Sequence, residues 1–216
     1  MTDAHCHLSV SDPSTTEFVV GRDFFGIHPW DADCVSDIAI DVVRRKLEEF
    51  PHAGVGEIGL DRLRTREIPD KMRTLFERQL LLALEYDRPV VLHGAKCWGQ
   101  VLGSVKRLSR TGGGRLSFLF HGFSRSDGLL PEIVAMGGFI SVGTAILNSH
   151  AVNYRELVRK IPGENLLVET DRTDAQSGPA VGEVLAALAD VRGESVEKLE
   201  CLTDSNARRF FGFDVQ

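Results

Sequence analysis

The stretch Pro89-Val90-Val91-Leu92-His93 decides the fold class. It is a short apolar run without polar alternation, which is typical of a strand buried on both faces of a parallel sheet. Leu166–Glu169 repeats the pattern, and further strands are expected at Ala4–Leu8, Phe24–Ile27, Gly54–Ile58, Leu116–Phe120 and Gly138–Val142. Amphipathic stretches separate these runs. The alternation of strand and helix predicts an α/β protein with a parallel sheet.

The helical patterns lie between the expected strands. They cover Ser36–Phe50, Asp70–Tyr86, Val101–Leu108, Leu129–Met136, Tyr154–Ile161, Gly182–Val191 and Val196–Phe211. The last is expected to end at Gly212, because glycine readily takes the left-handed conformation that closes a helix. Between Leu8 and Phe24 there is no helical pattern, although a parallel crossover normally needs a dozen or more residues and a helix. The first strand–helix unit is therefore predicted to be truncated or irregular.

Length and composition describe an ordinary globular chain. The 216 residues are 43% hydrophobic and 26% charged, and no repeat or low-complexity linker divides them, which favours a single domain spanning 1–216. A (β/α)8 barrel has typically about 250 residues, with a lower limit of about 200. The net charge of −6 argues against a protein that binds nucleic acid through a general basic face. A metal site can still supply positive charge locally.

The cysteines and the N-terminus indicate the compartment. The four cysteines form no Cys-x-x-Cys pair, so reduced thiols in a cytosolic chain are expected at Cys6, Cys34, Cys97 and Cys201. Met1-Thr2-Asp3-Ala4-His5 lacks the basic and apolar segments of a signal peptide. No apolar run reaches the roughly 18 residues of a membrane span. We expect a cytoplasmic protein, monomeric by default, with no membrane partner.

Six polar residues stand at or near the carboxyl ends of five expected strands. In barrels that end carries the active site. One pair, His5 and His7, is spaced so that both imidazoles point to one side of a strand. A carboxylate inside an apolar strand, as at Glu57, is costly unless it is paired or bound to metal. Four imidazoles and two carboxylates suffice for two divalent ions if one carboxylate bridges. The candidate ligands are His5, His7, Glu57, His93, His121 and Asp171.

Taken singly, these residues have simpler explanations. Glu57 fits a buried ion pair, and Asp171 fits the N-cap of the next helix. A single His after an apolar strand, such as His93 or His121, is more often structural than a ligand. The agreement of six residues at corresponding strand ends favours the two-metal interpretation.

The motifs around these residues resemble the TatD family of metal-dependent deoxyribonucleases, including a compact bacterial subgroup. They come in family order over nearly the whole chain: Asp3-Ala4-His5-Cys6-His7-Leu8, Gly26-Ile27-His28-Pro29-Trp30, Gly56-Glu57-Ile58-Gly59-Leu60-Asp61, Val91-Leu92-His93, Phe120-His121-Gly122-Phe123-Ser124, Leu167-Val168-Glu169-Thr170-Asp171 and Asn206-Ala207-Arg208-Arg209-Phe210-Phe211-Gly212.

The resemblance implies a distorted TIM barrel and hydrolysis of phosphodiester bonds, with DNA as the usual substrate and often 3′→5′ exonuclease activity. It implies that His5, His7 and Asp171 hold one metal. It also implies that His93 and His121 hold a second, with Glu57 as the bridge. The ions would be Zn²⁺, Mn²⁺ or Mg²⁺, and the histidine content favours the first two.

The chain departs from the family pattern in three places. Gly94-Ala95-Lys96 follows His93 where the family commonly has an arginine and an acidic residue. Arg172-Thr173-Asp174 follows Asp171 where a small residue and a proline are common. The segment from His7 to His28 is short. These changes put the substrate in doubt more than the metal site.

The resemblance and the strand-end positions suggest further roles. Asp171 is a candidate to orient the nucleophilic water and take its proton, or is a pure ligand. His28 is a candidate catalytic and substrate-contacting residue, or a structural imidazole. Asp61 is expected in the loop after its strand, as a substrate contact, a partner of a ligand or a cap. Three basic residues follow ligand-bearing strands and are candidate phosphate contacts or solvated side chains: Lys96, Arg125 and Arg172.

Three functional alternatives remain at this point. The chain is a nuclease, a two-metal hydrolase of a small phosphoester, amide or lactone, or a non-catalytic metal-binding protein. Many two-metal hydrolase barrels bridge their ions with a modified lysine. Glu57 at that strand position favours the phosphodiesterase. Trp30 and Trp98 are candidates to stack on bases, with packing as the commoner explanation.

Overall fold

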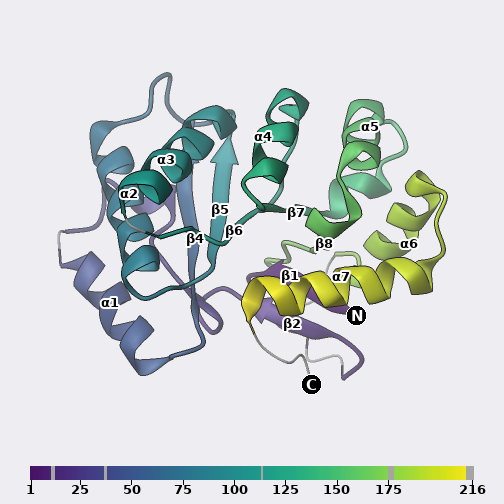
Figure 1. Ribbon diagram of the computed structural model, residues 1–216, viewed down its shortest axis with the longest axis horizontal. Coiled ribbons are helices and arrows are strands. Elements are labelled where there is room, and N and C mark those ends of the chain that lie inside the picture. The colour runs from purple at the N-terminus through teal and green to yellow at the C-terminus, as the bar shows by residue number, and fades with distance from the viewer. Residues whose placement is uncertain (11–12, 37, 113, 175–177, 213–216) are drawn as a thin grey trace. The chain divides into compact units, whose positions relative to one another are not determined.

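The computed structural model describes residues 1–10, 13–36, 38–112, 114–174 and 178–212 (Figure 1). The chain forms two compact units. The terminal unit comprises residues 1–20 and 121–216, and the central unit comprises residues 21–120. Each is described by itself. A single domain spanning 1–216 stays a prediction.

The central unit is built on four parallel strands. Their order is β3 (Phe24–Phe25), β4 (Gly54–Asp61), β5 (Val90–Ala95) and β6 (Phe118–Phe120). Phe24 pairs with Gly54 and Val90 pairs with Phe118, while the pairing of β4 with β5 shifts register between Val55 and Ile58. Every residue of β4 is buried. Burial along the whole strand explains why the run contains so few polar residues.

Three α-helices accompany these strands: α1 (Ala39–Glu49), α2 (Asp70–Glu85) and α3 (Trp98–Thr111), with a short 3₁₀ helix η1 (Pro29–Asp31) before them. Helix α2 packs against β4 and α3 (Figure 1). The buried face of α1 consists of Ile40, Val43 and Leu47. Two nearby apolar residues, Ile38 and Val42, are exposed.

The terminal unit holds two pairs of parallel strands. Strand β1 (Thr2–Cys6) pairs with β2 (Thr16–Val19), and β7 (Phe139–Val142) pairs with β8 (Leu166–Val168). Backbone hydrogen bonds connect the residues after β8 with the end of β1. The amide of Asp171 donates to the carbonyl of His5 at 3.0 Å, and the amide of His7 donates to the carbonyl of Arg172 at 2.8 Å. The residues that follow β8 therefore lie beside the end of β1.

The helices of the terminal unit follow the same alternation. They are η2 (Asp127–Leu129), α4 (Leu130–Ala135), η3 (Thr144–Leu147), α5 (Val152–Lys160), η4 (Gly163–Asn165), α6 (Val181–Arg192) and α7 (Val196–Phe211). Helix α7 packs against β8 and β1 (Figure 1). Ser195 caps its start by accepting a hydrogen bond from the Lys198 amide. Gly212 closes the helix with a φ of 75°, as expected.

The seven expected strands and seven expected helices are all present, with ends that differ by a few residues. The described residues between Cys6 and Thr16 form no helix, so the truncated first unit is confirmed. An eighth strand, β2, was not expected. It is held by Phe18, whose ring stacks on Phe211 with centroids 3.5 Å apart. Among the described residues, none of the helices combines the length and the apolar character that crossing a membrane requires.

Candidate metal centre

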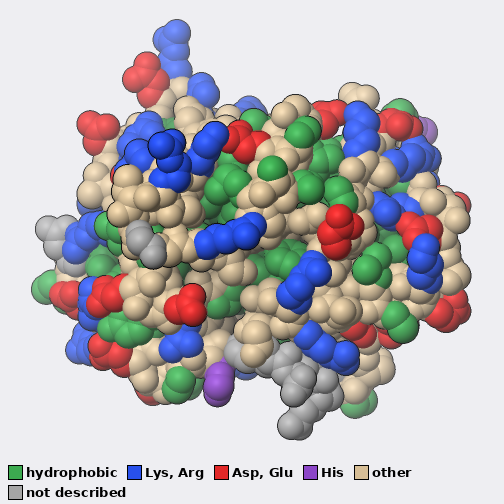
Figure 2. Space-filling view, in the orientation of Figure 1, with side chains coloured by type: hydrophobic (Ala, Val, Ile, Leu, Met, Phe, Trp, Pro, Cys, Tyr) green, Lys and Arg blue, Asp and Glu red, His purple; other side chains and the backbone are tan. Residues whose placement is uncertain are grey.

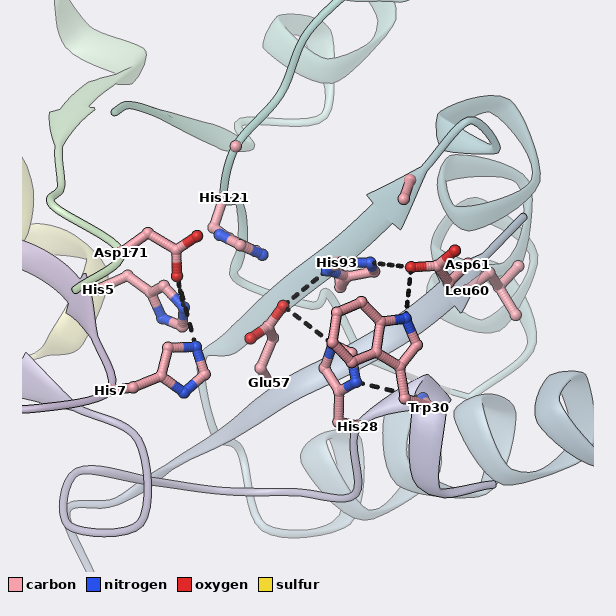
Figure 3. A network of polar contacts seen from close by, with 12 residues as sticks. His5, His7, His28, Trp30, Glu57, Leu60, Asp61, His93, His121 and Asp171 are labelled. Carbon is pink, nitrogen blue, oxygen red and sulfur yellow. Dashed lines mark hydrogen bonds and ion pairs between the residues drawn. The ribbon is translucent and has the colours of Figure 1, made fainter. Parts of the chain in front are cut away.

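Four of the candidate ligands lie in the terminal unit, where three of them form a tight group (Figure 3). The Asp171 Oδ1 atom is 3.5 Å from His5 Nε2 and 3.4 Å from His7 Nε2. The ring of His121 lies next to that of His5, with centroids 4.4 Å apart. We call these four residues, His5, His7, His121 and Asp171, the terminal cluster.

The charge state of Asp171 suits a ligand. Burial raises its pKa, but hydrogen bonds from His5 and His7 and the nearby His121 outweigh burial and hold the pKa well below the usual range. The carboxylate therefore stays ionised at neutral pH. A side chain with so low a pKa is a better metal ligand and water-orienting group than a proton acceptor.

Two buried carboxyl groups support the terminal cluster, and neither was among the functional residues expected from the sequence. Glu169 accepts hydrogen bonds from the Gly122 amide at 2.7 Å and from Ser141 Oγ at 2.5 Å, and lies 3.8 Å from His121 Nδ1. Burial raises its pKa, although the neighbouring imidazoles oppose this. Glu169 thus anchors the chain immediately after His121.

Asp3 anchors the backbone beside His5 in the same way. Its carboxylate accepts hydrogen bonds from the Thr170 amide at 3.0 Å and from Thr170 Oγ1 at 2.6 Å. It also accepts a longer one from the His5 amide at 3.4 Å. Burial raises the pKa of Asp3 to about 6. The sequence signal was available, because both Asp3 and Glu169 are carboxylates beside apolar residues, as Glu57 is.

The central unit holds a second group, the central cluster, formed by His28, Glu57 and His93 (Figure 3). Glu57 is buried in the middle of β4, and its Oε1 atom is 2.7 Å from His93 Nδ1 and 3.5 Å from His28 Nε2. His28 precedes η1, and its Nδ1 accepts a hydrogen bond from the Trp30 amide. The structure therefore turns Nε2 of His28, a candidate catalytic and substrate-contacting residue, toward the predicted bridging carboxylate.

Asp61 is the last residue of β4 and is buried, which corrects its expected position in the following loop. Its Oδ2 atom accepts a hydrogen bond from Trp30 Nε1 at 2.7 Å and lies 3.0 Å from His93 Nε2. Its Oδ1 atom accepts one from the Leu63 amide at 2.5 Å. With both oxygens engaged inside the protein, Asp61 positions His93. A direct substrate contact from Asp61 stays untested.

The two carboxylates also determine the charge of His93. Burial lowers the pKa of His93, but the hydrogen bond and charge of Glu57, followed by those of Asp61, outweigh burial and raise the pKa. The Asp61 pKa is lowered in turn. Burial opposes this, but the Leu63 amide, His93 and Trp30 all favour the ionised form. Such a carboxylate–imidazole pair is the usual support of a metal-binding histidine.

The three candidate phosphate contacts differ in their surroundings. Lys96 and Arg125 are exposed in the segments after β5 and β6. The side chain of Arg172 is almost fully buried, 3.7 Å from Glu17 and bonded to the Pro179 carbonyl at 3.1 Å. That arrangement favours a structural role for Arg172. On the face shown in Figure 2, the Lys and Arg side chains over α5 and α6 lie among Asp and Glu side chains.

The two tryptophans also differ. Trp98 is buried and packs on Phe120, with ring centroids 5.0 Å apart, so it belongs to the core. Trp30 is 46% exposed, and the guanidinium carbon of Arg64 lies 3.8 Å from the centre of its ring. Only Trp30 offers an accessible aromatic face.

Comparison with known proteins identifies the family. The model of the family described as TatD related DNase matches residues 22–212. The chain belongs to the TatD family. The protein named 3'-5' ssDNA/RNA exonuclease TatD from Klebsiella pneumoniae is 32% identical over 204 residues, which cover 88% of this chain and 76% of that protein. The chain is therefore a metal-dependent hydrolase of the TatD family.

Solved structures of TatD proteins confirm the predicted α/β fold of distorted TIM-barrel type. The crystal structure of the TatD homologue YjjV from Escherichia coli matches with a TM-score of 0.77 at 27% identity, over 94% of this chain and 79% of that one. A TatD-like protein from Archaeoglobus fulgidus matches over 99% of this chain and 100% of its own, with a TM-score of 0.61 at 18% identity. The second match shows that this fold occurs in a chain of the same extent.

The donor sets fit the metal dependence of the TatD family. In each cluster, three residues offer ligand atoms within 4.8 Å of one another: His5, His7 and Asp171 in one, and His28, Glu57 and His93 in the other. Imidazole and carboxylate ligands lie roughly 2 Å from a zinc ion, so the ligands of one ion are roughly 3–4 Å apart. Small side-chain adjustments would bring either set to that spacing.

Proposed function

We propose that the protein is a deoxyribonuclease that hydrolyses the phosphodiester bonds of single-stranded DNA from the 3′ end. The observation that carries the proposal is the pair of imidazole–carboxylate clusters, which include all six ligands expected from the TatD motifs. The relative from Klebsiella pneumoniae, named as a 3'-5' ssDNA/RNA exonuclease, supports this substrate and polarity. RNA is the second substrate that this name suggests.

The proposal includes two divalent ions. The assignment implied by the family is His5, His7 and Asp171 for one ion, His93 and His121 for the other, and Glu57 as the bridge. Four imidazoles favour Zn²⁺ or Mn²⁺ over Mg²⁺, since imidazole is a borderline ligand and Mg²⁺ prefers oxygen. Each structural cluster contains enough donors for one ion.

The chemistry divides between the ions and the protein. Bound divalent ions lower the pKa of water and polarise the phosphoryl oxygen. Asp171, kept ionised by His5 and His7, orients the attacking water, and the proton of that water passes to solvent. His28, 22% exposed beside Glu57, contacts the phosphate or protonates the leaving oxygen. Asp61 and Glu169 keep His93 and His121 in position.

The test is a substrate panel with the metal-loaded protein. We expect hydrolysis of 5′-labelled single-stranded DNA to release a ladder shortened from the 3′ end, with slower cleavage of duplex DNA. Glu57→Ala and Asp171→Asn should lower kcat by at least about a hundredfold. The matched control Asp33→Asn changes an exposed carboxylate outside both clusters and should keep full activity. Turnover of small esters, amides or lactones without cleavage of any nucleic acid would refute the nuclease proposal.

A further inference from the structure

The terminal unit contains a cavity that the proposed chemistry does not use. It has a volume of about 1020 Å³ and lies between the segment after β6 and the start of α5. Its lining includes Ser124, Arg125, His150, Asn153 and Tyr154. Pockets of roughly 300–1,000 Å³ hold ligands of nucleotide size. The cavity therefore has room for a nucleotide and part of its neighbour.

Four polar side chains of this cavity are available to a ligand. Within the described part of the chain, the side chains of Ser124, Arg125, His150 and Asn153 make no hydrogen bond or ion pair. The other charged residues of the lining are already paired: Lys160 is bound to Asp127 at 3.1 Å, and Glu156 is bound to Arg159. The cavity thus presents an uncompensated guanidinium with a hydroxyl, an imidazole and an amide. That combination binds phosphate oxygens.

The N-terminal end of α5 also favours the binding of an anion. Its first turn has no acidic residue, and Ala151 provides no side-chain cap. The partial positive charge of a helix N-terminus favours an anion nearby. Ala151, Val152 and Asn153 all line the cavity, so this end of α5 faces it.

A series of contacts links the lining of the cavity to the residues beside the terminal cluster. The Tyr154 hydroxyl accepts a hydrogen bond from the Gly143 amide at 3.1 Å. Gly143 in turn packs on Glu169, because a Cβ added there would lie 3.3 Å from Oε1. The same Oε1 atom accepts the amide hydrogen of Gly122, next to His121. Arg125 is four residues beyond His121, a distance of at most about 14 Å along the chain.

We propose that this cavity is the subsite for a nucleotide adjacent to the hydrolysed phosphodiester, with Arg125 and Asn153 on its phosphate and the Tyr154 ring beside its base. The inference rests on the proposed function and extends it from the cleaved bond to the flanking strand. Arg125 is the residue expected to contribute most, since a guanidinium binds two phosphate oxygens at once. The ligand is a single-stranded nucleic acid, DNA or RNA.

The test compares Arg125→Ala with Arg45→Ala. Arg45 is an exposed arginine in α1 for which the described chain shows no side-chain partner, so it serves as the matched control. The probes are a ten-nucleotide single strand of thymidine, the corresponding RNA, and bis(p-nitrophenyl) phosphate, a diester without a flanking nucleotide. KM and kcat are measured for each probe, and KM for the strand is measured over a range of salt concentrations.

We expect Arg125→Ala to raise KM for the ten-nucleotide strand about tenfold, and to raise it less for the small diester. Loss of one phosphate contact should also reduce the slope of log affinity against log salt by about 0.7. Arg125→Lys should restore most of the slope because it keeps the charge, and Arg45→Ala should change neither quantity. A larger effect on the RNA strand than on DNA would still support the subsite and name RNA as its preferred occupant.

The outcomes separate this inference from the proposed function. If wild-type protein cleaves the strand and Arg125→Ala leaves KM and the salt slope unchanged, the subsite is refuted and the nuclease stands. Equal loss on the strand and on the small diester also refutes the subsite. If wild-type protein hydrolyses the small diester but neither strand, the nuclease proposal itself fails.

Discussion

Asp61→Asn tests whether a buried carboxylate holds His93 ready for metal. Asp61 is only 1% exposed. It accepts hydrogen bonds from Trp30 Nε1 and the Leu63 amide, and its Oδ2 atom lies 3.0 Å from His93 Nε2. Asparagine has nearly the same shape but only one acceptor oxygen. Either the Trp30 or the Leu63 donor must then face an amide NH₂ group, and the negative charge beside His93 is lost.

The size of the effect follows from these contacts. A buried donor left without a partner costs about 1–3 kcal/mol of stability. Removing the carboxylate that supports a metal-binding histidine typically lowers metal affinity about 10–100-fold. We therefore expect Asp61→Asn to weaken zinc binding by 10-fold or more and to lower the melting temperature of the metal-free protein modestly.

The assay is competition for zinc against a chelator of known affinity, with melting measured on the same samples. Trp30→Phe is the graded control, because it removes one donor to Asp61 and leaves the carboxylate beside His93. Its effect on zinc affinity should be smaller than that of Asp61→Asn. If Asp61→Asn lowers the melting temperature but keeps zinc affinity within twofold of wild type, Asp61 is only structural and the reasoning is refuted.

The further predictions concern stability and metal dependence. Burial raises the Asp3 pKa to about 6 from 3.8, so ionisation of Asp3 costs stability as the pH rises through this range. In urea unfolding of the metal-free protein, the free energy of unfolding of Asp3→Asn relative to wild type should rise by up to about 3 kcal/mol between pH 4 and 7. If this difference between variant and wild type stays constant with pH, the raised pKa of Asp3 is contradicted. Gly59→Ala should unfold the protein or destabilise it by several kcal/mol, since the added Cβ would lie 1.9 Å from the His93 carbonyl oxygen. Gly103 lies in α3, where an added Cβ would meet open space, so Gly103→Ala should stabilise the protein by about 0.5–1 kcal/mol, measured by thermal melting. Chelation should abolish hydrolysis and lower the melting temperature, with both restored by Zn²⁺ or Mn²⁺, and a chelator-insensitive melt would mean that no ion stabilises the fold.

The fold was predictable where burial left a continuous apolar run. Pro89–Leu92 and Leu166–Glu169 were such runs, and β5 and β8 are found there. Strand β2 was not predicted because its sequence, Thr16-Glu17-Phe18-Val19, is short and contains a charge. Glu17 is buried there through contacts with Ser9, the Val10 amide and Arg172, which local sequence does not reveal.

The candidate ligands were predictable because their chemistry is local to each strand end. Their supporting groups stand out in the sequence only as carboxylates beside apolar residues, and their roles were not predictable because these depend on contacts between distant segments. Asp3 and Thr170 are 167 positions apart, and their hydrogen bonds form only when β1 lies beside the end of β8. The surroundings of Arg172, a candidate phosphate contact, also depend on a distant segment. Its buried partner Glu17 belongs to β2, the strand that was not expected.

The central claim is that these ligands hold two divalent ions. A crystal structure of protein loaded with Zn²⁺ or Mn²⁺, with anomalous data collected at the absorption edge of the metal, tests it most directly. We expect two anomalous peaks about 3.5–4 Å apart, bound by His5, His7, Glu57, His93, His121 and Asp171. A single peak, or peaks bound by other residues while these six side chains stay clear of metal, would contradict it.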